Sequence, residues 1–236
     1  MQPHVQNAVK YYSFDSLNHS GKVTHAISTR HGGVSPAPFA SLNLGKSVGD
    51  APENVAENLN RWFGALDLKR DAAVTASQAQ ADQVAIIERD QRGTIIPDTD
   101  ALITRHTGIP LVLRYADCVP ILFFDPQTPA IGIAHTGWRG TVAKIAMRTA
   151  RAMMQYFGSE PQELIACIGP SIGPCCYRVG DEVIQRARAA FPSDGLLIVQ
   201  PSGAIHFDLW NANAQQLREL GIEQIEIARL CTSDRT

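Results

Sequence analysis

Short apolar segments follow one another closely between residues 72 and 135, and they constrain the fold more than any other feature of the sequence. Several are almost continuously apolar, which is typical of strands buried on both faces of a sheet. They leave no room for a crossover helix after each strand, which argues against a regular doubly wound βαβ array. We expect strands over residues 72–76, 84–87, 101–104, 110–115, 119–124 and 130–135.

Helical patterns flank this strand-rich region. A helix is expected to begin near Pro52, capped by Asp50 and by a capping box that Glu53 completes. Another should follow residues 137–140 and end at Gly158, since glycine suits a helix C-terminus. Further helices are expected over residues 180–191 and 209–220, and further strands over residues 22–29, 164–168, 196–199 and 224–230.

The sequence shows no internal division. No linker, charge block, repeat or low-complexity stretch separates two halves. We therefore expect one α/β (α+β) domain over residues 1–236, with mixed β-sheets sandwiched by helices. Residues 1–9 are expected to form a loose tail.

The net charge and the cysteine content indicate which partners, location and thiol state to expect. The formal net charge is −2 and no Lys/Arg cluster is present, so neither nucleic acid nor a membrane surface is an expected partner. The first residues lack a signal-peptide pattern and no apolar run is long enough to span a bilayer, which predicts a cytoplasmic location. The five cysteines, at positions 118, 167, 175, 176 and 231, are an odd number, which favours reduced thiols over a disulfide framework.

A cysteine and a histidine stand at predicted strand ends. Cys118 follows Asp117 at the start of one strand, and His135 ends the next strand before the turn 137–140. Thiolate sulfur and imidazole nitrogen are both good zinc ligands. The pair could instead act as nucleophile and base, with the histidine lowering the pKa of the thiol. Spacing alone leaves open a metal site, a nucleophile–base pair or two unrelated residues.

Two arginines lie in glycine-containing loops. Arg139 follows Trp138 in the turn that opens a predicted helix, and Arg30 precedes the pair Gly32-Gly33. A guanidinium fork in such a loop can hold a phosphate or a carboxylate. The alternative is a solvated arginine, stacked on tryptophan in the case of Arg139. Neither loop matches a phosphate-loop or dinucleotide fingerprint.

Several unusual motifs occur in the same order as in one known family. Through them the chain resembles the multicopper polyphenol oxidase or laccase-domain family, also described as purine nucleoside phosphorylase-like. The similarity extends from about residue 20 to the end of the sequence. The motifs are TRHGGVSPAPFASLNLG (29–45), DTDALIT (98–104), LRYADCVPILFFD (113–125), IGIAHTGWRGTV (131–142) and IGPSIGPCCYRVGDEV (168–183).

The resemblance implies a single α/β domain with one zinc ion. It also implies phosphorolysis of purine nucleosides such as adenosine, inosine or methylthioadenosine, and deamination of adenosine. Cys118 matches the cysteine ligand of the family's ADC motif, and His135 matches the histidine ligand of its AH-[AT]-GWRG turn. Copper, which an older family name suggests, is disfavoured because the seven histidines are scattered and form no His-x-His pair.

The sequence departs from the family pattern in two places. Gln80, in Gln78-Ala79-Gln80, stands where the family has its third metal-ligating histidine. A neutral amide oxygen is a poor zinc ligand compared with imidazole, so we expect zinc to bind weakly. The aromatic-Ser-x-Arg segment of the family is not found after Cys231-Thr232.

The chemistry that the resemblance implies gives roles to the remaining candidates. Asp117 is expected to accept a proton or to orient a zinc ligand. Arg139 or Arg30 is expected to place the phosphate, and Asn43 to hold a sugar hydroxyl or a base edge. Purine nucleosides and phosphate are then the small-molecule partners.

Two other functions remain open at this stage. One is a metal-independent cysteine hydrolase with Cys118 as nucleophile, His135 as base and Gln80 donating to an oxyanion. The other is a catalytically impaired member of the family, in which Gln80 has removed the activity.

Overall fold

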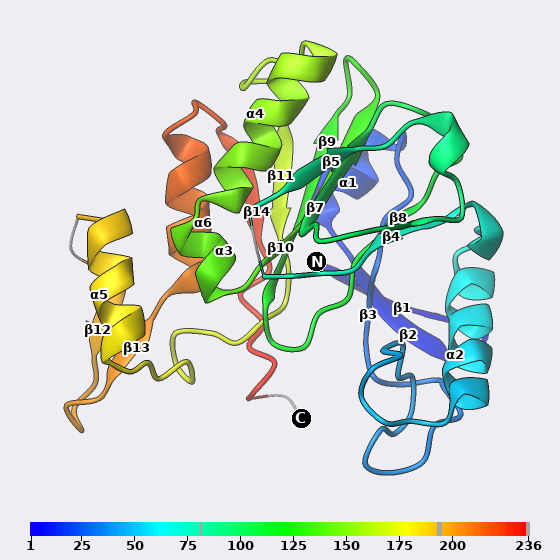
Figure 1. Ribbon diagram of the computed structural model, residues 1–236, viewed down its shortest axis with the longest axis horizontal. Helices are drawn as coiled ribbons and strands as arrows, with labels where there is room; N and C mark the ends of the chain where they lie inside the picture. The colour runs from blue at the N-terminus through cyan, green and yellow to red at the C-terminus, as the bar shows by residue number, and fades with distance from the viewer. Residues whose placement is uncertain (81, 193–194, 235–236) are drawn as a thin grey trace.

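A six-stranded mixed sheet lies at the centre of the computed structural model, which describes residues 1–80, 82–192 and 195–234 (Figure 1). The four middle strands are antiparallel to one another, and each of the two edge strands pairs in parallel with the middle strand beside it. In order across the sheet the strands are β14 (Gln224–Ile227), β11 (Ile165–Ile168), β9 (Val119–Asp125), β10 (Ala130–Thr136), β7 (Ala101–Thr104) and β5 (Val84–Ile86). The mixed α/β fold expected from the sequence is confirmed.

Both faces of this sheet are buried, which accounts for its continuously apolar strands. Successive residues of a strand point to opposite faces. Phe123 accordingly belongs to the main core between sheet and helices, whereas Phe124 packs with Phe14 and Leu17 on the other face. Both phenylalanines are almost fully buried.

Helices from the second half of the chain cover one face of the sheet. They are α3 (Trp138–Val142), α4 (Ile145–Phe157) and α6 (Leu209–Arg218), and α4 packs along β10 and β7 and against α6 (Figure 1). Beyond them lie α5 (Asp181–Ala190) and a hairpin formed by β12 (Leu197–Val199) and β13 (Ile205–Phe207).

The expected single helix after residues 137–140 is in fact two helices. Lys144 has a φ of 62°, in the left-handed region, and forms the N-cap of α4. This conformation interrupts the helical hydrogen-bond ladder, so α3 ends at Val142. The expected end at Gly158 is confirmed, because this glycine has a φ of 73° and caps α4.

The N-terminal region forms a separate three-stranded sheet, so the expected loose tail over residues 1–9 is wrong. β1 (Gln2–Gln6) pairs antiparallel with β2 (Val9–Ser13), and β2 pairs with β3 (Ile27–Ser28). His4 stacks on Tyr11 with ring centroids 5.0 Å apart, which gives this polar strand a packing partner. The strand expected over residues 22–29 shortens to β3, and α1 (Asp15–Ser20) was not expected.

Helix α2 (Pro52–Ala65) begins at the expected proline, but the expected cap is wrong. Its N-cap is Ala51, which makes no side-chain capping bond. The Asp50 carboxylate instead accepts hydrogen bonds from the Ser35 hydroxyl, at 2.6 Å, and from the Asn43 amide, at 2.9 Å. Asp50 therefore binds mainly the preceding loop, although its carboxylate also accepts the backbone amide of Ala51 at 2.8 Å.

A third, parallel sheet lies between these parts. It has β4 (Val74–Ala76) in the middle, flanked by β6 (Ile95–Ile96) and β8 (Leu111–Val112). Two 3-10 turns, at Arg70–Ala72 and Arg89–Gln91, complete the secondary structure. Among the described residues, no helix combines the length and apolar character needed to cross a membrane.

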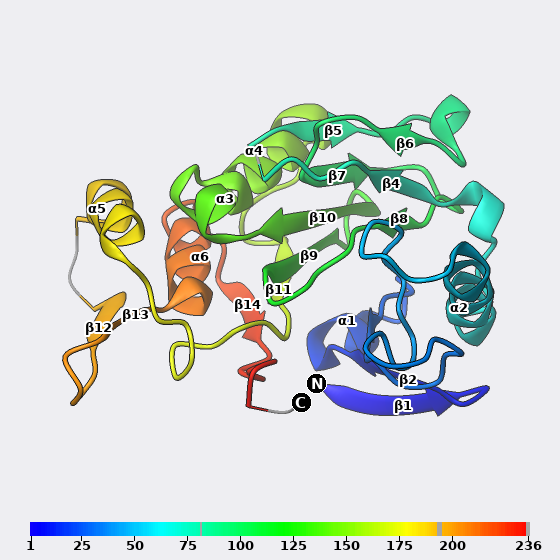
Figure 2. The same ribbon diagram turned by 60° about the horizontal axis from the view of Figure 1, so that its bottom comes forward.

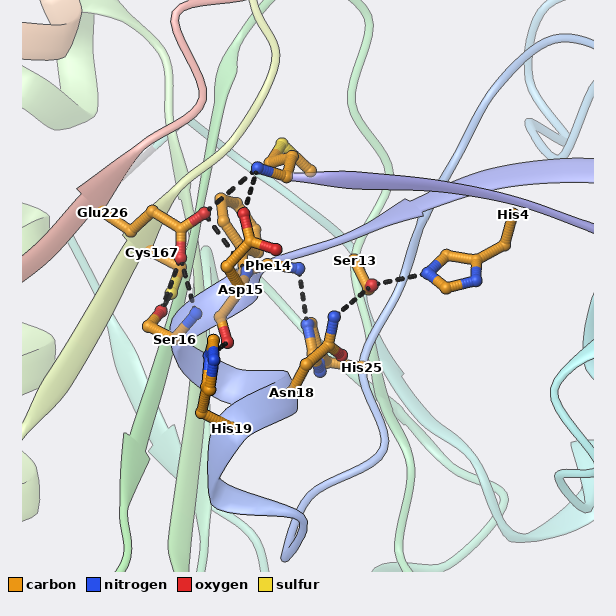
Figure 3. Close-up of polar contacts among 11 residues, drawn as sticks. His4, Ser13, Phe14, Asp15, Ser16, Asn18, His19, His25, Cys167 and Glu226 are labelled. Carbon is orange, nitrogen blue, oxygen red and sulfur yellow. Dashed lines mark hydrogen bonds and ion pairs between the residues drawn. The ribbon is translucent and has the colours of Figure 1, made fainter.

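A half-buried acidic contact joins the N-terminal region to β14, the edge strand of the central sheet (Figure 3). Glu226 of β14 accepts hydrogen bonds from the Ser16 hydroxyl, at 2.6 Å, and from the Ser16 backbone amide, at 2.9 Å. The terminal amine of Met1 lies 3.4 Å from the same carboxylate. Burial opposes ionisation, but these hydrogen bonds prevail and hold the pKa of Glu226 below its usual value.

Replacing this carboxylate should destabilise the protein in a pH-dependent way. We expect Glu226→Gln to lower the free energy of unfolding at pH 7 by about 1–2 kcal/mol, because hydrogen bonds to a charged group are lost. A depressed folded-state pKa stabilises the protein above the unfolded-state pKa, and this stabilisation disappears as the pH falls through the folded-state value. The difference from the parent protein, measured by urea denaturation, should therefore shrink under acid conditions.

The control for this measurement is Glu223→Gln, which changes an exposed glutamate just before β14. It should alter stability little at any pH. A Glu226→Gln penalty that stayed constant down to acid pH would show that the carboxylate contributes by packing and not by its charge.

Candidate active site

Antiparallel pairing brings three chain segments to one end of the central sheet. Thr136 pairs with Val119 across β10 and β9, and Ala134 pairs with Ala101 across β10 and β7. The residues just before β9 and β7 therefore lie next to the end of β10. Figure 2 shows the three strands side by side, with α3 following β10 directly.

Asp100 holds His135 in one orientation at this end of the sheet. The Nδ1 atom of His135 lies 2.7 Å from a carboxylate oxygen of Asp100, and both side chains are buried. The other carboxylate oxygen accepts the backbone amide of Ala79 at 3.0 Å. A carboxylate acceptor places the imidazole proton on Nδ1, so the lone pair is on Nε2. Such an imidazole can act as a metal ligand or as a base.

Cys118 packs closely against the turn after β10. A Cβ atom on Gly137 would lie 2.9 Å from the Cys118 sulfur, so only glycine fits there without a shift. Burial, and then the charges of Asp117 and Asp100, raise the pKa of the Cys118 thiol. Within the described residues no hydrogen bond joins this thiol to His135. The raised pKa is opposite to that of an activated nucleophile, so this environment disfavours the cysteine hydrolase.

Gln80 contacts an arginine of the same end of the sheet. The Arg139 guanidinium donates to the Gln80 side-chain oxygen at 3.2 Å and lies 4.4 Å from the Trp138 ring centroid. Gln80 has a φ of 55°, an uncommon conformation for a residue other than glycine. Its amide oxygen is therefore already engaged by a cation.

The donor set at this end of the sheet does not fit a three-ligand zinc site. Catalytic zinc is usually held by three protein ligands and a water. Cys118 and His135 supply one thiol and one imidazole, and the third position carries the amide of Gln80. Over residues 1–80, 82–192 and 195–234, no group of three His, Cys, Asp or Glu ligand atoms converges around this pair.

Asp117 links this site to the C-terminal segment. Its carboxylate accepts the Thr232 hydroxyl at 2.5 Å, and its backbone oxygen accepts the Ile172 amide at 2.9 Å. Asp117 has a φ of 68°, a left-handed conformation that aspartate tolerates better than most residues. The chain can therefore turn sharply before entering β9.

The other two predicted residues lie in the loop between β3 and α2. The Arg30 Nε atom donates to the Ala40 carbonyl at 2.8 Å, while Asn43 donates to Asp50 at 2.9 Å and accepts the Gly45 amide at 2.9 Å. The Asn43 side chain thus shapes its own loop.

Some of the residues predicted for the site line a cavity of about 1650 Å³. Arg30 and Asn43 line it together with Asp117 and Thr232. Cys118, His135, Gln80 and Arg139 are not among its lining residues. The predicted residues therefore fall into two groups, and Asp117 lies at their junction.

Sequence reasoning missed two side chains of the site. Asp100 had a usable signal, since it is the acidic residue directly before the apolar strand of the DTDALIT motif. Tyr177 had none. Burial, and then the charge of Cys118, raise the pKa of Tyr177 to about 12, and the charge of Arg139 opposes this. The phenol is thus close enough to both side chains to be influenced by their charges.

Comparisons with known proteins identify the family. Residues 24–236 match the family described as multi-copper polyphenol oxidoreductase laccase. The chain therefore belongs to this family, as the sequence motifs indicated.

Relatives of known name cover most of the chain. A purine nucleoside phosphorylase of Bacteroides thetaiotaomicron is 34% identical over 93% of this chain and 85% of its own length. A purine nucleoside phosphorylase of Deinococcus radiodurans is 36% identical over 90% of this chain and 81% of its own length.

Solved structures agree with this assignment. YlmD from Geobacillus stearothermophilus superposes with a TM-score of 0.85 at 34% identity, covering 89% of this chain and 82% of that one. The hypothetical protein YfiH from Bacillus licheniformis superposes with a TM-score of 0.88 at 32% identity, covering 97% and 88%.

The contact between Cys118 and Gly137 can be tested by a double-mutant cycle. We expect Gly137→Ala to lower the free energy of unfolding by about 1–3 kcal/mol, because the new methyl group overlaps the sulfur. The penalty should be smaller in a Cys118→Ala background, where the sulfur is absent. Urea denaturation of the four proteins measures the coupling.

Gly180→Ala is the matched control. Gly180 is also a helix N-cap with extended backbone, but no atom lies within 4 Å of an added Cβ. This variant measures the effect of alanine at an N-cap alone. Equal Gly137→Ala penalties with and without the Cys118 sulfur would refute the close contact.

Proposed function

We propose that this protein catalyses the phosphorolysis of a purine nucleoside. The observation that carries the proposal is the similarity, over about nine-tenths of the chain, to relatives named purine nucleoside phosphorylase. The arrangement of Arg139, Asp117 and His135 near one end of the sheet supports it. These residues offer a cation for phosphate and two groups able to move a proton.

The reaction defines what these residues must do. A phosphate oxygen forms a bond to C1′ of the ribose while the bond from C1′ to the purine nitrogen breaks. The proton that hydrogen phosphate gives up balances the one that the departing purine gains. The products are ribose 1-phosphate and the free purine.

We assign Arg139 to phosphate and Asp117 to proton transfer. The Arg139 fork can bind two phosphate oxygens once it releases the Gln80 amide, which holds it through a single neutral acceptor. The Thr232 hydroxyl fixes the orientation of the Asp117 carboxylate. In this proposal Arg30 and Asn43, on the cavity that Asp117 also lines, contact the nucleoside.

A phosphate-dependence assay tests the activity. Incubation with adenosine and phosphate, with and without added zinc, should yield adenine and ribose 1-phosphate, resolved by chromatography. Product should not form when phosphate is omitted. Inosine formed without phosphate would indicate adenosine deamination and would contradict phosphorolysis as the main reaction.

The same assay tests the role of Arg139. We expect Arg139→Ala to raise the KM for phosphate by about tenfold or more, since hydrogen bonds to a charged partner contribute about 1.5–3 kcal/mol. Arg151→Ala, which removes an exposed arginine of α4, is the control and should leave this KM unchanged. An Arg139→Ala variant with an unaltered phosphate KM would remove this residue from the phosphate site.

We further propose that Cys118 and His135 hold zinc only weakly because Gln80 replaces a stronger ligand. Gln80→His should then raise zinc affinity by at least about tenfold, because imidazole is a better zinc ligand than a neutral amide. Competition with a chromophoric chelator gives the affinities of parent and variant side by side.

Gln83→His is the control for this change. It introduces the same side chain at an exposed position three residues along the chain and should leave zinc affinity unchanged. Identical affinities for the Gln80→His variant and its parent would contradict the proposal. Zinc that resisted chelation in the parent but was lost on Cys118→Ser would contradict it as well.

A further inference from the structure

Three thiols and a carboxylate converge outside the group formed by Cys118 and His135. Cys175 and Cys176 lie in the loop after β11, and Cys231 and Asp234 lie in the segment after β14. Their ligand atoms all lie within 4.8 Å of one another. We call these four residues the thiol cluster.

Specific contacts hold the thiol cluster together. The two oxygens of Asp234 accept from different thiols, Cys175 at 3.2 Å and Cys176 at 3.1 Å. The Cys231 sulfur accepts the backbone amide of Gly173 at 3.2 Å. An amide donor to sulfur favours the thiolate, and such hydrogen bonds commonly surround metal-bound ligands.

The parallel pairing of β11 with β14 assembles the thiol cluster. Parallel neighbours end at the same edge of a sheet, so the segments that follow them continue side by side. Ser171 and Cys231 form a parallel bridge, in which the Ser171 amide donates to Leu230 and the Thr232 amide donates to Ser171. Residues distant in sequence are thereby brought together without any local motif.

We propose that Cys175, Cys176, Cys231 and Asp234 form a zinc site separate from Cys118 and His135. Three thiolates with one carboxylate are a soft, anionic ligand set that selects zinc over magnesium or calcium. Four protein ligands close the coordination sphere, as in structural zinc sites. This inference does not depend on the proposed phosphorylase activity.

The spacing of the ligand atoms suits tetrahedral coordination. With zinc–sulfur bonds of about 2.3 Å, a tetrahedron has edges of roughly 3.8 Å. The ligand atoms already lie within 4.8 Å of one another, so the side chains need to move only slightly to close around an ion. Cys175 is exposed and Cys176 half-buried, which leaves a path from solvent.

Metal binding at the thiol cluster would depend on pH, because zinc binds thiolates and not thiols. Zinc would displace the thiol protons to solvent, so its affinity should rise with pH.

Zinc in the thiol cluster would fasten the C-terminal segment beside the candidate active site. Thr232 follows the ligand Cys231 directly, and its hydroxyl binds the carboxylate of Asp117. The loop after β11 is bound to the same residue, because Ile172 donates to the Asp117 carbonyl. The ion would therefore limit the movement of both segments that contact Asp117.

Cobalt binding tests this proposal without any activity measurement. The protein is reduced, stripped with a chelator and titrated with Co²⁺, which gives a sulfur-to-cobalt charge-transfer band whose intensity grows with the number of thiolate ligands. We expect an intense multi-thiolate band, lost on addition of zinc, and a rise in Tm when zinc is added. A protein with no such band would overturn the proposal.

Cysteine variants locate the ion. The double variant Cys175→Ser/Cys176→Ser should lose at least about 100-fold in zinc affinity, since even changes outside the ligand shell lower affinity 10–100-fold. Cys118→Ser should retain the band, and Cys167→Ser, at a buried thiol outside the thiol cluster, is the matched control. Loss of the band in Cys118→Ser and its survival in the double variant would place the metal at the other site and overturn the proposal.

Two further measurements distinguish loss of a ligand from unfolding, and a metal site from a disulfide. Asp234→Asn alters an exposed side chain and leaves every cysteine in place, so it should weaken zinc binding without unfolding the protein. Mass spectrometry of the protein before reduction counts free thiols. A disulfide within the thiol cluster, together with a reduced protein that takes up no zinc, would show a redox pair instead of a metal site.

Discussion

The antiparallel register of β7, β10 and β9 is the constraint on which the candidate site depends. Because Thr136 faces Val119 and Ala134 faces Ala101, the entries to β9 and β7 meet the exit of β10. A slip of one residue would turn every side chain of β10 to the other face. His135 would then lose Asp100, so the buried pairs along the strands also preserve the orientation of the imidazole.

Most of the chemically reactive side chains lie at one end of the central sheet, where β10, β11 and β14 end and β9 begins. β11 and β14 end where β9 begins, so their following segments approach the same edge as Cys118 and His135. Asp117 contacts both segments. The loop after β11 donates to its backbone oxygen, and the C-terminal segment donates to its carboxylate. The order of strands thus brings the segments that carry the thiol cluster to the same end of the sheet as Asp117, next to Cys118.

The sequence predicted the fold well where burial is strong and periodic. The strand over residues 101–104 agrees at both ends, and α2 begins at Pro52 as expected. Prediction failed where tertiary contacts override local pattern. β1 is polar and exposed and becomes a strand only by pairing with β2, and Lys144 has no sequence signal for the left-handed conformation that ends α3.

The same distinction applies to the site. The motifs that carry Cys118 and His135 could be found, because each lies at a strand end that the apolar runs define. Asp100 acts through contacts that only the register creates, and the thiol cluster joins segments more than fifty residues apart, as the Gly173–Cys231 contact shows. Such groupings arise from the order of strands in the sheet, which no local spacing encodes.

The contact of Glu226 with Ser16 and Met1 has a consequence for the order of folding. Glu226 and Met1 are separated by 225 positions, so the N-terminal hairpin cannot reach its final contacts until β14 has been synthesised. Closing so long a loop is slow compared with forming local structure. Phe14 and Leu17 can pack on Phe124 and Ile165 once β9 and β11 are present, but the contacts with Glu226 cannot form before β14 has been synthesised. The contact between Met1 and Glu226 is therefore one of the last that this chain can form.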